Sequence, residues 1–200
     1  TDYTVEDIER IFGHKIASLV DGLTKMSGVF NADTSAQAEY FRKVLLTLSD
    51  DVRVILIKIA DRLHNMRTLQ FMPLNKQIKI TGETIYLFAP LAYRLGLYPI
   101  KSELEDLSLK YLEPEAYNHI LHELKESEAE RMAFIEKFLE PVRQLLDRDG
   151  IKYHIKSRTK SVFSIFQKMR KQRVDFHGVY DIFALRIIID CPVEREKAQC

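Results

Sequence analysis

The chain has 200 residues, of which 46% are hydrophobic and 30% charged, so it is long enough to bury a core and has the composition of a globular protein. Its formal net charge of +1 excludes the strong overall positive field that marks many nucleic-acid-binding proteins. Cys191 and Cys200 are too few for a disulfide scaffold, and no apolar run approaches the roughly 20 residues of a membrane span.

The sequence pattern of residues 1–150 predicts a region that is wholly helical. Thr4 and either Asp50 or Asp51 are the clearest N-caps, and Gly13 and Gly96 are the clearest stops. The expected helices cover about residues 4–12, 16–26, 34–48, 52–69, 76–94, 100–111 and 114–148, with a loop over 28–33. Pro90 falls inside one of these helices, where it should remove one backbone hydrogen bond and bend the helix.

The pattern changes after Gly150, where alternation replaces the helical period. Residues 152–157 alternate like a strand, and residues 161–171 predict an amphipathic helix. The apolar stripe of this helix consists of Val162, Ile165, Phe166 and Met169. Residues 183–189 are rich in isoleucine, which is typical of a buried strand. We therefore expect an α/β domain to begin after residue 150. Because the chain starts without Met and stops soon after this strand, we also expect it to be a piece of a longer protein.

The central helix, residues 52–69, carries two kinds of side chain. Its apolar stripe consists of Val52, Ile55, Ile59, Leu63 and Met66. Val54 and Ile57 lie on the opposite side, so the first half of the helix is expected to be buried all round. Asp61, Asn65 and Thr68 follow on that second side at spacings of i, i+4 and i+7, in one polar line about two turns long.

Polar groups on a buried helix need partners. A carboxylate, an amide and a hydroxyl are costly to bury unless hydrogen bonds satisfy them. They could form a structural network with a neighbouring helix, or a site in which Asp61 binds a metal ion while Asn65 and Thr68 bind a ligand. The spacing by itself favours neither reading.

A second polar group lies where residues 156–169 predict a strand end leading into a helix. Arg158, Lys160, Ser164 and Lys168 are spread along this loop and the first helical turns. Helix N-termini favour phosphate, and Arg and Lys add charge-assisted contacts to a triphosphate. The alternative is an ordinary basic helix on the surface.

Residues 57–69, Ile-Lys-Ile-Ala-Asp-Arg-Leu-His-Asn-Met-Arg-Thr-Leu, resemble the signature of the RelA/SpoT-homologue family. Its enzymes make and degrade the guanosine alarmones ppGpp and pppGpp. Stretches that resemble the same family follow in order at residues 19–26, 89–96, 103–107 and 111–117. The resemblance covers essentially the whole chain, so it is far more specific than one short motif.

This resemblance implies a mainly α fold. It implies an all-helical HD-type hydrolase domain over residues 1–113, connecting helices over 114–150, and the start of an α/β nucleotidyltransferase-like synthetase domain over 151–200. In the family, the His-Asp pair of the hydrolase site lies before the position of Thr1, and part of the synthetase site lies after that of Cys200. We therefore expect the 200-residue chain by itself to catalyse neither reaction.

For the hydrolase, the resemblance implies a divalent ion, usually Mn²⁺, with Asp61 as one ligand. It matches Asn65 and Thr68 to positions that contact the guanosine nucleotide. Carboxylates and imidazoles suit Mn²⁺, and the ion lowers the pKa of a bound water. His64 lies one turn from Asp61, but the family assigns it no such role, and a lone His is more often packed or facing solvent. Tyr93 stands where the family usually has His.

For the synthetase, the resemblance matches Arg158, Lys160, Ser164 and Lys168 to the element that binds ATP and the reacting phosphates. Ser157 stands where Gly is usual in that element. Asp181, just before the strand at 183–189, matches the Mg²⁺-binding Asp. The reaction moves a pyrophosphate from ATP to the 3′-hydroxyl of GDP or GTP, and alignment and charge neutralisation supply most of the catalysis.

The resemblance thus implies a bifunctional cytoplasmic enzyme of the stringent response that acts on GDP, GTP, ATP and (p)ppGpp. Few cysteines fit a reducing compartment. No membrane contact and no direct nucleic-acid binding by this chain are expected, and ribosome contact is expected only through later domains. The alternative is a degenerate helical regulator that binds guanosine nucleotides without catalysis, which the intact Asp61 and Asn65 disfavour.

Overall fold

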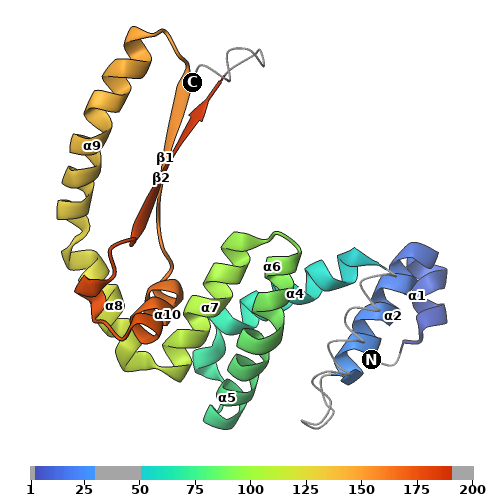
Figure 1. Cartoon of the computed structure of the whole chain (residues 1–200). Helices are drawn as coiled ribbons and strands as arrows, with labels where there is room; N and C mark the ends of the chain where they lie inside the picture. The colour runs from blue at the N-terminus through green and yellow to red at the C-terminus, as the bar shows by residue number, and fades with distance from the viewer. Residues whose placement is uncertain (1–2, 30–50, 191–200) are drawn as a thin grey trace. The chain divides into compact units, whose positions relative to one another are not determined.

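The computed structural model describes residues 3–29 and 51–190 of the chain (Figure 1). The chain divides into two compact units, Thr1–Ser108 and Leu109–Cys200, and each is described by itself. Helices dominate the described residues, which confirms the expected mainly helical fold. None of the described helices is long and apolar enough to cross a membrane. The helix expected over 34–48 lies outside the described residues.

The first unit is helical throughout its described part. Its elements are α1 (Val5–Phe12), α2 (His14–Val29), α4 (Val52–Arg67), a 3₁₀ turn (Leu69–Phe71), α5 (Leu74–Glu83), a π-helix (Thr84–Phe88), α6 (Ala89–Arg94) and α7 (Tyr98–Leu112), whose last turn belongs to the second unit. The loop expected from residue 28 is wrong at its start, because α2 continues through Val29.

Capping side chains begin two of these helices as expected. The Thr4 hydroxyl accepts the Asp7 backbone N–H at 3.2 Å, and the Thr4 N–H donates to the Asp7 carboxylate at 3.0 Å, which forms a capping box. The Asp51 carboxylate accepts the Arg53 N–H at 2.9 Å and caps α4. At the end of α6, Gly96 takes a left-handed φ of 73°, which a residue with a side chain rarely adopts.

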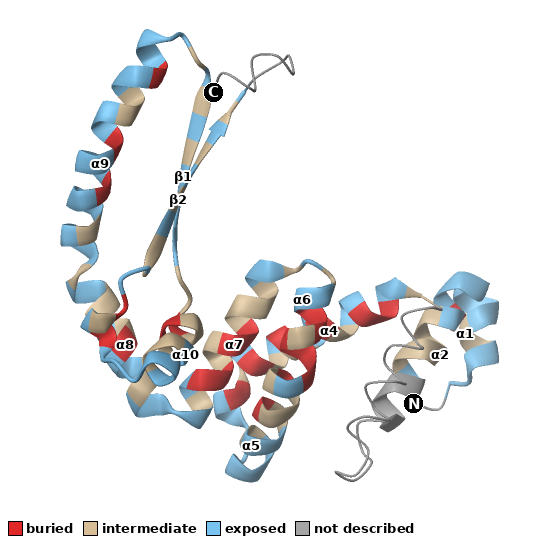
Figure 2. Cartoon of the chain, viewed as in Figure 1, coloured by how far each residue is buried: buried red, intermediate tan, exposed pale blue. Residues whose placement is uncertain are grey.

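Helix α4 buries one face, and Figure 2 shows its buried residues in red. Ile55, Ile59 and Met66 are fully buried, and Val54 is 2% exposed. Val52 and Ile57, however, are 45% and 44% exposed. The prediction that the first half of this helix is buried all round is therefore wrong. Helical spacing shows which side chains share a face, but not how many faces are covered.

A glycine lets α2 approach α4 closely. A Cβ atom added to Gly22 would lie 3.0 Å from a methyl group of Val54, which is itself buried and stiff at χ1. The two helices are in contact, so a larger residue at position 22 would press on the core of α4.

The segment around Pro90 differs from the expected single bent helix. Pro90 lies in the first turn of α6, and the π-helix directly precedes it. The Ala89 N–H bonds to the Thr84 carbonyl, five residues back. A proline ring clashes with the carbonyl four residues before it, and the wider π turn relieves that clash while the chain stays helical.

The second unit combines helices with a strand pair. Its elements are α8 (Pro114–Glu126), α9 (Glu128–Arg148), β1 (Tyr153–Thr159), α10 (Val162–Gln172), a 3₁₀ turn (Phe176–Gly178) and β2 (Phe183–Ile189). Strands β1 and β2 pair antiparallel, with Tyr153 opposite Ile189 and Thr159 opposite Phe183. Strand β2 has the expected bounds, whereas β1 begins one residue and ends two residues later than expected and α10 is shifted by one residue.

Strand β2 is not buried as expected. Its residues alternate between half-buried and exposed, and Ile188 is 39% exposed. Within the described residues β2 has one neighbouring strand, β1. An isoleucine-rich run indicates a strand, but burial of both faces depends on layers that the run itself does not specify.

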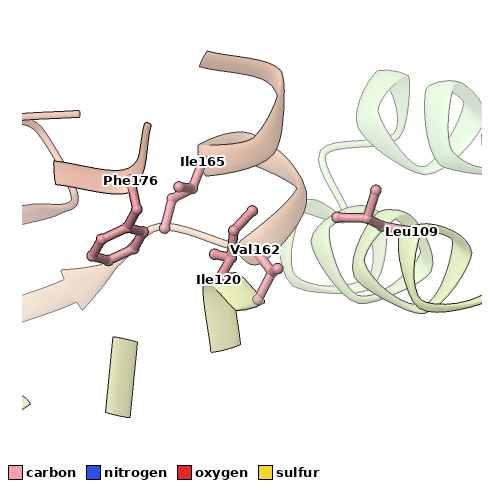
Figure 3. Close-up of a cluster of buried hydrophobic side chains, with 5 residues drawn as sticks. All are labelled: Leu109, Ile120, Val162, Ile165 and Phe176. Carbon is pink, nitrogen blue, oxygen red and sulfur yellow. The ribbon is translucent and has the colours of Figure 1, made fainter. Parts of the chain in front are cut away.

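The core of the second unit gathers around α10. Leu109, Ile120, Val162, Ile165 and Phe176 form its buried cluster (Figure 3). Phe166 and Met169 pack against this cluster and are half-buried. The predicted apolar stripe of α10 is therefore confirmed, and it leaves the opposite side of that helix to polar residues.

Candidate functional site

The first candidate site lies on α4. Asp61 is exposed, and the Asn65 amide donates to its carboxylate at 3.4 Å. Thr68 follows at the end of the helix, where its hydroxyl donates to the His64 carbonyl at 3.0 Å. The structure thus brings Asp61 and Asn65 together and keeps Thr68 on the next turn.

The expectation that Asp61 sits in an apolar helical wall is wrong. Its side of α4 is open, and among the described residues it has no ion-pair partner and no hydrogen bond to another helix. A structural network between helices therefore does not explain the polar line within the described part of the chain. An exposed carboxylate next to an amide remains available to a ligand.

Two arginines that the sequence-based reasoning overlooked hold α4 in place. The Arg62 guanidinium donates to Glu83 at 2.8 Å and to the Ile80 carbonyl at 3.3 Å, and it lies 4.3 Å above the Phe88 ring. Its side chain is only 11% exposed. These contacts tie the residue next to Asp61 to the end of α5 and to the π-helix.

Arg67 is the second of the two arginines that hold α4. Its guanidinium forms two parallel bonds to Glu103 on α7, at 2.6 and 2.9 Å. Both arginines lie within the signature stretch 57–69, next to Asp61 and Thr68. That sequence position could have identified them as candidate residues.

The second candidate site lies at the start of α10. The ammonium groups of Lys160 and Lys168 both donate to one carboxylate oxygen of Asp181. Lys160 follows β1, and its backbone N–H bonds to the Ile182 carbonyl at 2.8 Å, which places it next to Asp181. The strand pair and α10 therefore bring three of the predicted residues together.

Electrostatics at this cluster are strong although it is open to solvent. The hydrogen bonds from Lys160 and then Lys168 lower the pKa of Asp181 to about 2. The bond to Asp181 in turn raises the pKa of Lys168. Two cations on one carboxylate leave an excess positive charge, which suits a phosphate group.

The other two predicted residues have different places. Ser164 lies in the first turn of α10, where its hydroxyl accepts a bond from the Ser161 hydroxyl at 2.9 Å. Ser161 caps this helix through the Ser164 backbone N–H. Arg158 lies on β1, exposed, and it makes no ion pair among the described residues.

Neither site is a complete metal centre within the described residues. No group of three or more His, Cys, Asp or Glu side chains gathers there in a way that could hold an ion. Asp61 and Asp181 each offer one carboxylate, whereas hard divalent ions take several oxygen or nitrogen ligands. The Asp181 oxygen is moreover held by two ammonium groups, so a metal ion would have to displace them.

Two family models match the chain. Residues 1–98 match a model described as an HD domain, and residues 157–199 match a model described as a region found in RelA / SpoT proteins. The first match contains Asp61, Asn65 and Thr68, and the second contains the cluster around Asp181. An HD domain implies dependence on a divalent metal ion.

Curated relatives are similar over nearly the whole chain. A Synechocystis protein named "Probable guanosine-3′,5′-bis(diphosphate) 3′-pyrophosphohydrolase" is 44% identical over 200 residues, which is 99% of this chain and 26% of the relative. A GTP pyrophosphokinase of Myxococcus xanthus is 44% identical over 92% of this chain and 25% of its own length. A guanosine-3′,5′-bis(diphosphate) 3′-pyrophosphohydrolase of Aquifex aeolicus is 42% identical over 95% of this chain and 27% of its own.

The chain thus spans about a quarter of the length of these relatives. The resemblance of the signature stretch and its flanking segments is confirmed along the whole sequence. An HD domain that contains Asp61 is followed by a RelA/SpoT region that contains Asp181. Over nearly its whole length the chain is therefore similar to proteins named as RelA/SpoT-type (p)ppGpp hydrolases and GTP pyrophosphokinases.

Proposed function

We propose that the protein carrying this chain catalyses two opposing reactions. One hydrolyses the 3′-pyrophosphate of (p)ppGpp to give GDP or GTP, and the other transfers a pyrophosphate from ATP to the 3′-hydroxyl of GDP or GTP. One observation carries the proposal: the two candidate sites lie in separate compact units, each inside the matching family region. The names of the relatives, which cover both reactions, support it.

In the hydrolase, Asp61 would supply one ligand to a Mn²⁺ ion, and Asn65 and Thr68 would contact the guanosine nucleotide. The open side of α4 supports this role, because a nucleotide can reach these side chains. Arg62 and Arg67 would act as positioning residues, since they hold the two ends of the polar line without sharing its exposed face.

In the synthetase, Lys160 and Lys168 would bind the phosphates of ATP, with Arg158 and Ser164 at the same end of α10. A triphosphate carries more negative charge than one carboxylate, so it would draw the two ammonium groups away from Asp181. Asp181 would then be released to supply a ligand to Mg²⁺. Nucleotide binding and metal binding would in this way favour each other.

The division into domains follows the same proposal. The hydrolase part would cover residues 1–113, with connecting helices over 114–150 and the synthetase part from 151 on. In support, the second compact unit begins at Leu109. The few cysteines fit a cytoplasmic location, and ribosome contact would need other parts of the protein.

The test measures both reactions in the whole protein. Asp61→Ala should lower (p)ppGpp hydrolysis with Mn²⁺ by more than roughly 100-fold and leave synthesis with Mg²⁺ within about 2-fold, because it removes one metal ligand. Asp181→Ala should do the reverse. Glu130→Ala removes an exposed acid of α9 outside both sites and should change neither rate.

Loss of both activities from either substitution would contradict the assignment to separate sites. Nucleotide binding by the unaltered protein, without turnover in either direction, would instead support the regulator that binds without catalysis.

A further inference from the structure

The second unit contains a cavity on the opposite side of α10 from Ser164 and Lys168. Its volume is about 280 Å³, and residues of α8, of α10 and of the turn after α10 line it. Its apolar part consists of Ala116, Ile120, Phe166, Met169 and Val174. Ile120 is fully buried and Phe166 and Met169 are half-buried, so these side chains are held by the core and form a fixed wall.

The polar residues that line this cavity are all basic. Arg170 and Arg173 lie along it, together with His119 of α8, and no acidic side chain lines it. The Arg170 guanidinium lies 5.6 Å from the centre of the Phe166 ring, so it stands directly over the apolar wall. His119 has an acidic neighbour in Glu123, at 4.0 Å, whereas neither arginine forms an ion pair among the described residues.

The turn that ends α10 places Arg173 at this cavity. Arg173 takes a left-handed φ of 57°, which is uncommon for a residue other than glycine. Its N–H and that of Val174 both bond to the Met169 carbonyl, so the helix ends in a defined turn. This turn therefore fixes the backbone of Arg173 and Val174 where they line the cavity.

This cavity is separate from the cluster around Asp181. Phe166, Met169, Arg170 and Arg173 recur at spacings of three and four and share one face of α10. Lys168 and Ser164 fall on the other face of the same helix, where Lys168 bonds to Asp181. A ligand of the cavity would thus not meet the residues that we assign to ATP.

Size and charge together define what the cavity can hold. Small-molecule sites usually measure roughly 300–1,000 Å³. At about 280 Å³ this cavity lies just below that range, so it fits no more than a single ring. Two guanidinium groups in a cavity that no acidic side chain lines match a doubly charged anion, and the fork of Arg is well shaped for phosphate.

We propose that the cavity between α8 and α10 is a binding site for a small molecule that joins one aromatic ring to a phosphate group. The ring packs against Phe166, Met169 and Ile120, and the phosphate meets Arg170 and Arg173. This site goes beyond the two proposed reactions and depends on neither of them.

Methionine methyl NMR on the whole protein tests the proposal. Of the described methionines, only Met169 lines the cavity, and its signal is assigned by Met169→Leu. Phenyl phosphate should shift this signal in a saturable manner. Phenol and inorganic phosphate, which each carry half of the ligand, should bind at least roughly 10-fold more weakly, because each loses either the apolar contact or the charged bonds.

Matched variants locate the site. Arg170→Gln and Arg173→Gln should each weaken phenyl phosphate binding about 5-fold or more, since each removes one charged contact. Lys171→Gln removes the same charge from the same helix but lies outside the cavity, and it should leave the affinity unchanged. Ala116→Leu should fill the cavity and abolish the shift without removing a charge.

The proposal is overturned if the Met169 signal does not respond, if the three probes bind equally well, or if Lys171→Gln weakens binding as much as Arg173→Gln does. Circular dichroism of each variant checks that α8 and α10 remain folded.

Discussion

The two carboxylates that we assign to catalysis have opposite surroundings. Asp181 is held by two lysine ammonium groups, whereas Asp61 has an amide beside it and no cation among the described residues. A carboxylate that already neutralises two cations is poorly disposed to bind a metal ion until an anion takes those cations away. The same residue type is therefore in a different state in each site before any ligand binds.

The pKa of Asp181 reports this state. Replacement of one partner by Lys168→Gln should raise that pKa from about 2 towards the ordinary 3.8, because one of the two hydrogen bonds that lower it is lost. Carboxyl ¹³C shifts followed against pH measure it. Lys171→Gln, on the same helix but outside the cluster, should leave it unchanged. An ordinary pKa for Asp181 in the unaltered protein would contradict the cluster.

The lowered pKa of Asp181 determines how the stability of the folded chain changes with pH. Asp181 binds its proton more weakly in the folded chain than in the unfolded chain, so its ion pairs add stability above about pH 4. That contribution is lost as the pH falls through about 2. Because the carboxylate is about half exposed, salt should weaken the effect.

At the scale of elements, helix α4 owes its position to more than its apolar face. Arg62 joins α4 to α5 and the π-helix through an ion pair with Glu83, a hydrogen bond to the Ile80 carbonyl and a contact with the Phe88 ring. Such a contact needs the planar guanidinium, since an ammonium group cannot make all three at once. The arginine next to Asp61 therefore sets how α4 presents its polar line.

Removal of this contact should destabilise the first unit. Arg62→Ala should lower the free energy of unfolding by about 2–3 kcal/mol, because Glu83 is left without its partner in a half-buried place. Arg62→Lys should cost less, since the charge remains. Urea denaturation measures both.

Arg67→Ala is the matched control for this substitution. It breaks the exposed pair with Glu103 and should have a much smaller effect. If Arg62→Ala and Arg67→Ala lowered the free energy of unfolding equally, burial of the Arg62 contacts would not add to stability.

At the scale of the whole molecule, each unit holds its own buried side chains. Ile55, Ile59 and Met66 belong to the first, and Ile120 and Ile165 belong to the second. Charge is also unevenly distributed. Between Gly150 and Val174 the sequence has no Asp or Glu, so the near-neutral net charge conceals a strongly basic stretch.

Because the two units have separate cores, a substitution that leaves a void in one core should not affect the other unit. Ile165→Ala removes part of a fully buried side chain and should cost about 2–4 kcal/mol in the second unit. Amide hydrogen exchange should speed up in α8 and α10 and stay unchanged in α4. Ile59→Ala should give the reverse pattern. Faster exchange throughout the chain from either substitution would mean that the two units unfold together.

Local chemistry accounts for what could be predicted of the fold. Thr4 and Asp51 cap helices and Gly96 ends one because their backbone preferences act within a few residues. The bounds of β2 were predicted for the same reason, whereas its half-exposed state and the exposure of Val52 were not. Burial depends on which segment covers a face, and no local pattern contains that information.

For the candidate sites, too, the sequence predicted some features and only the tertiary structure decided others. The sequence by itself determined the helices, the strands and, through family resemblance, the residues to examine, because spacing and residue type are local properties of the chain. Only the tertiary structure decided that Lys160 and Lys168 share Asp181, that Asp61 is open, and that Arg62 anchors α4. The bonds of Asp181 and of Arg62 join residues far apart in sequence, and the exposure of Asp61 depends on which segments cover α4. The folding of the chain, rather than the preference of any single residue, decides both.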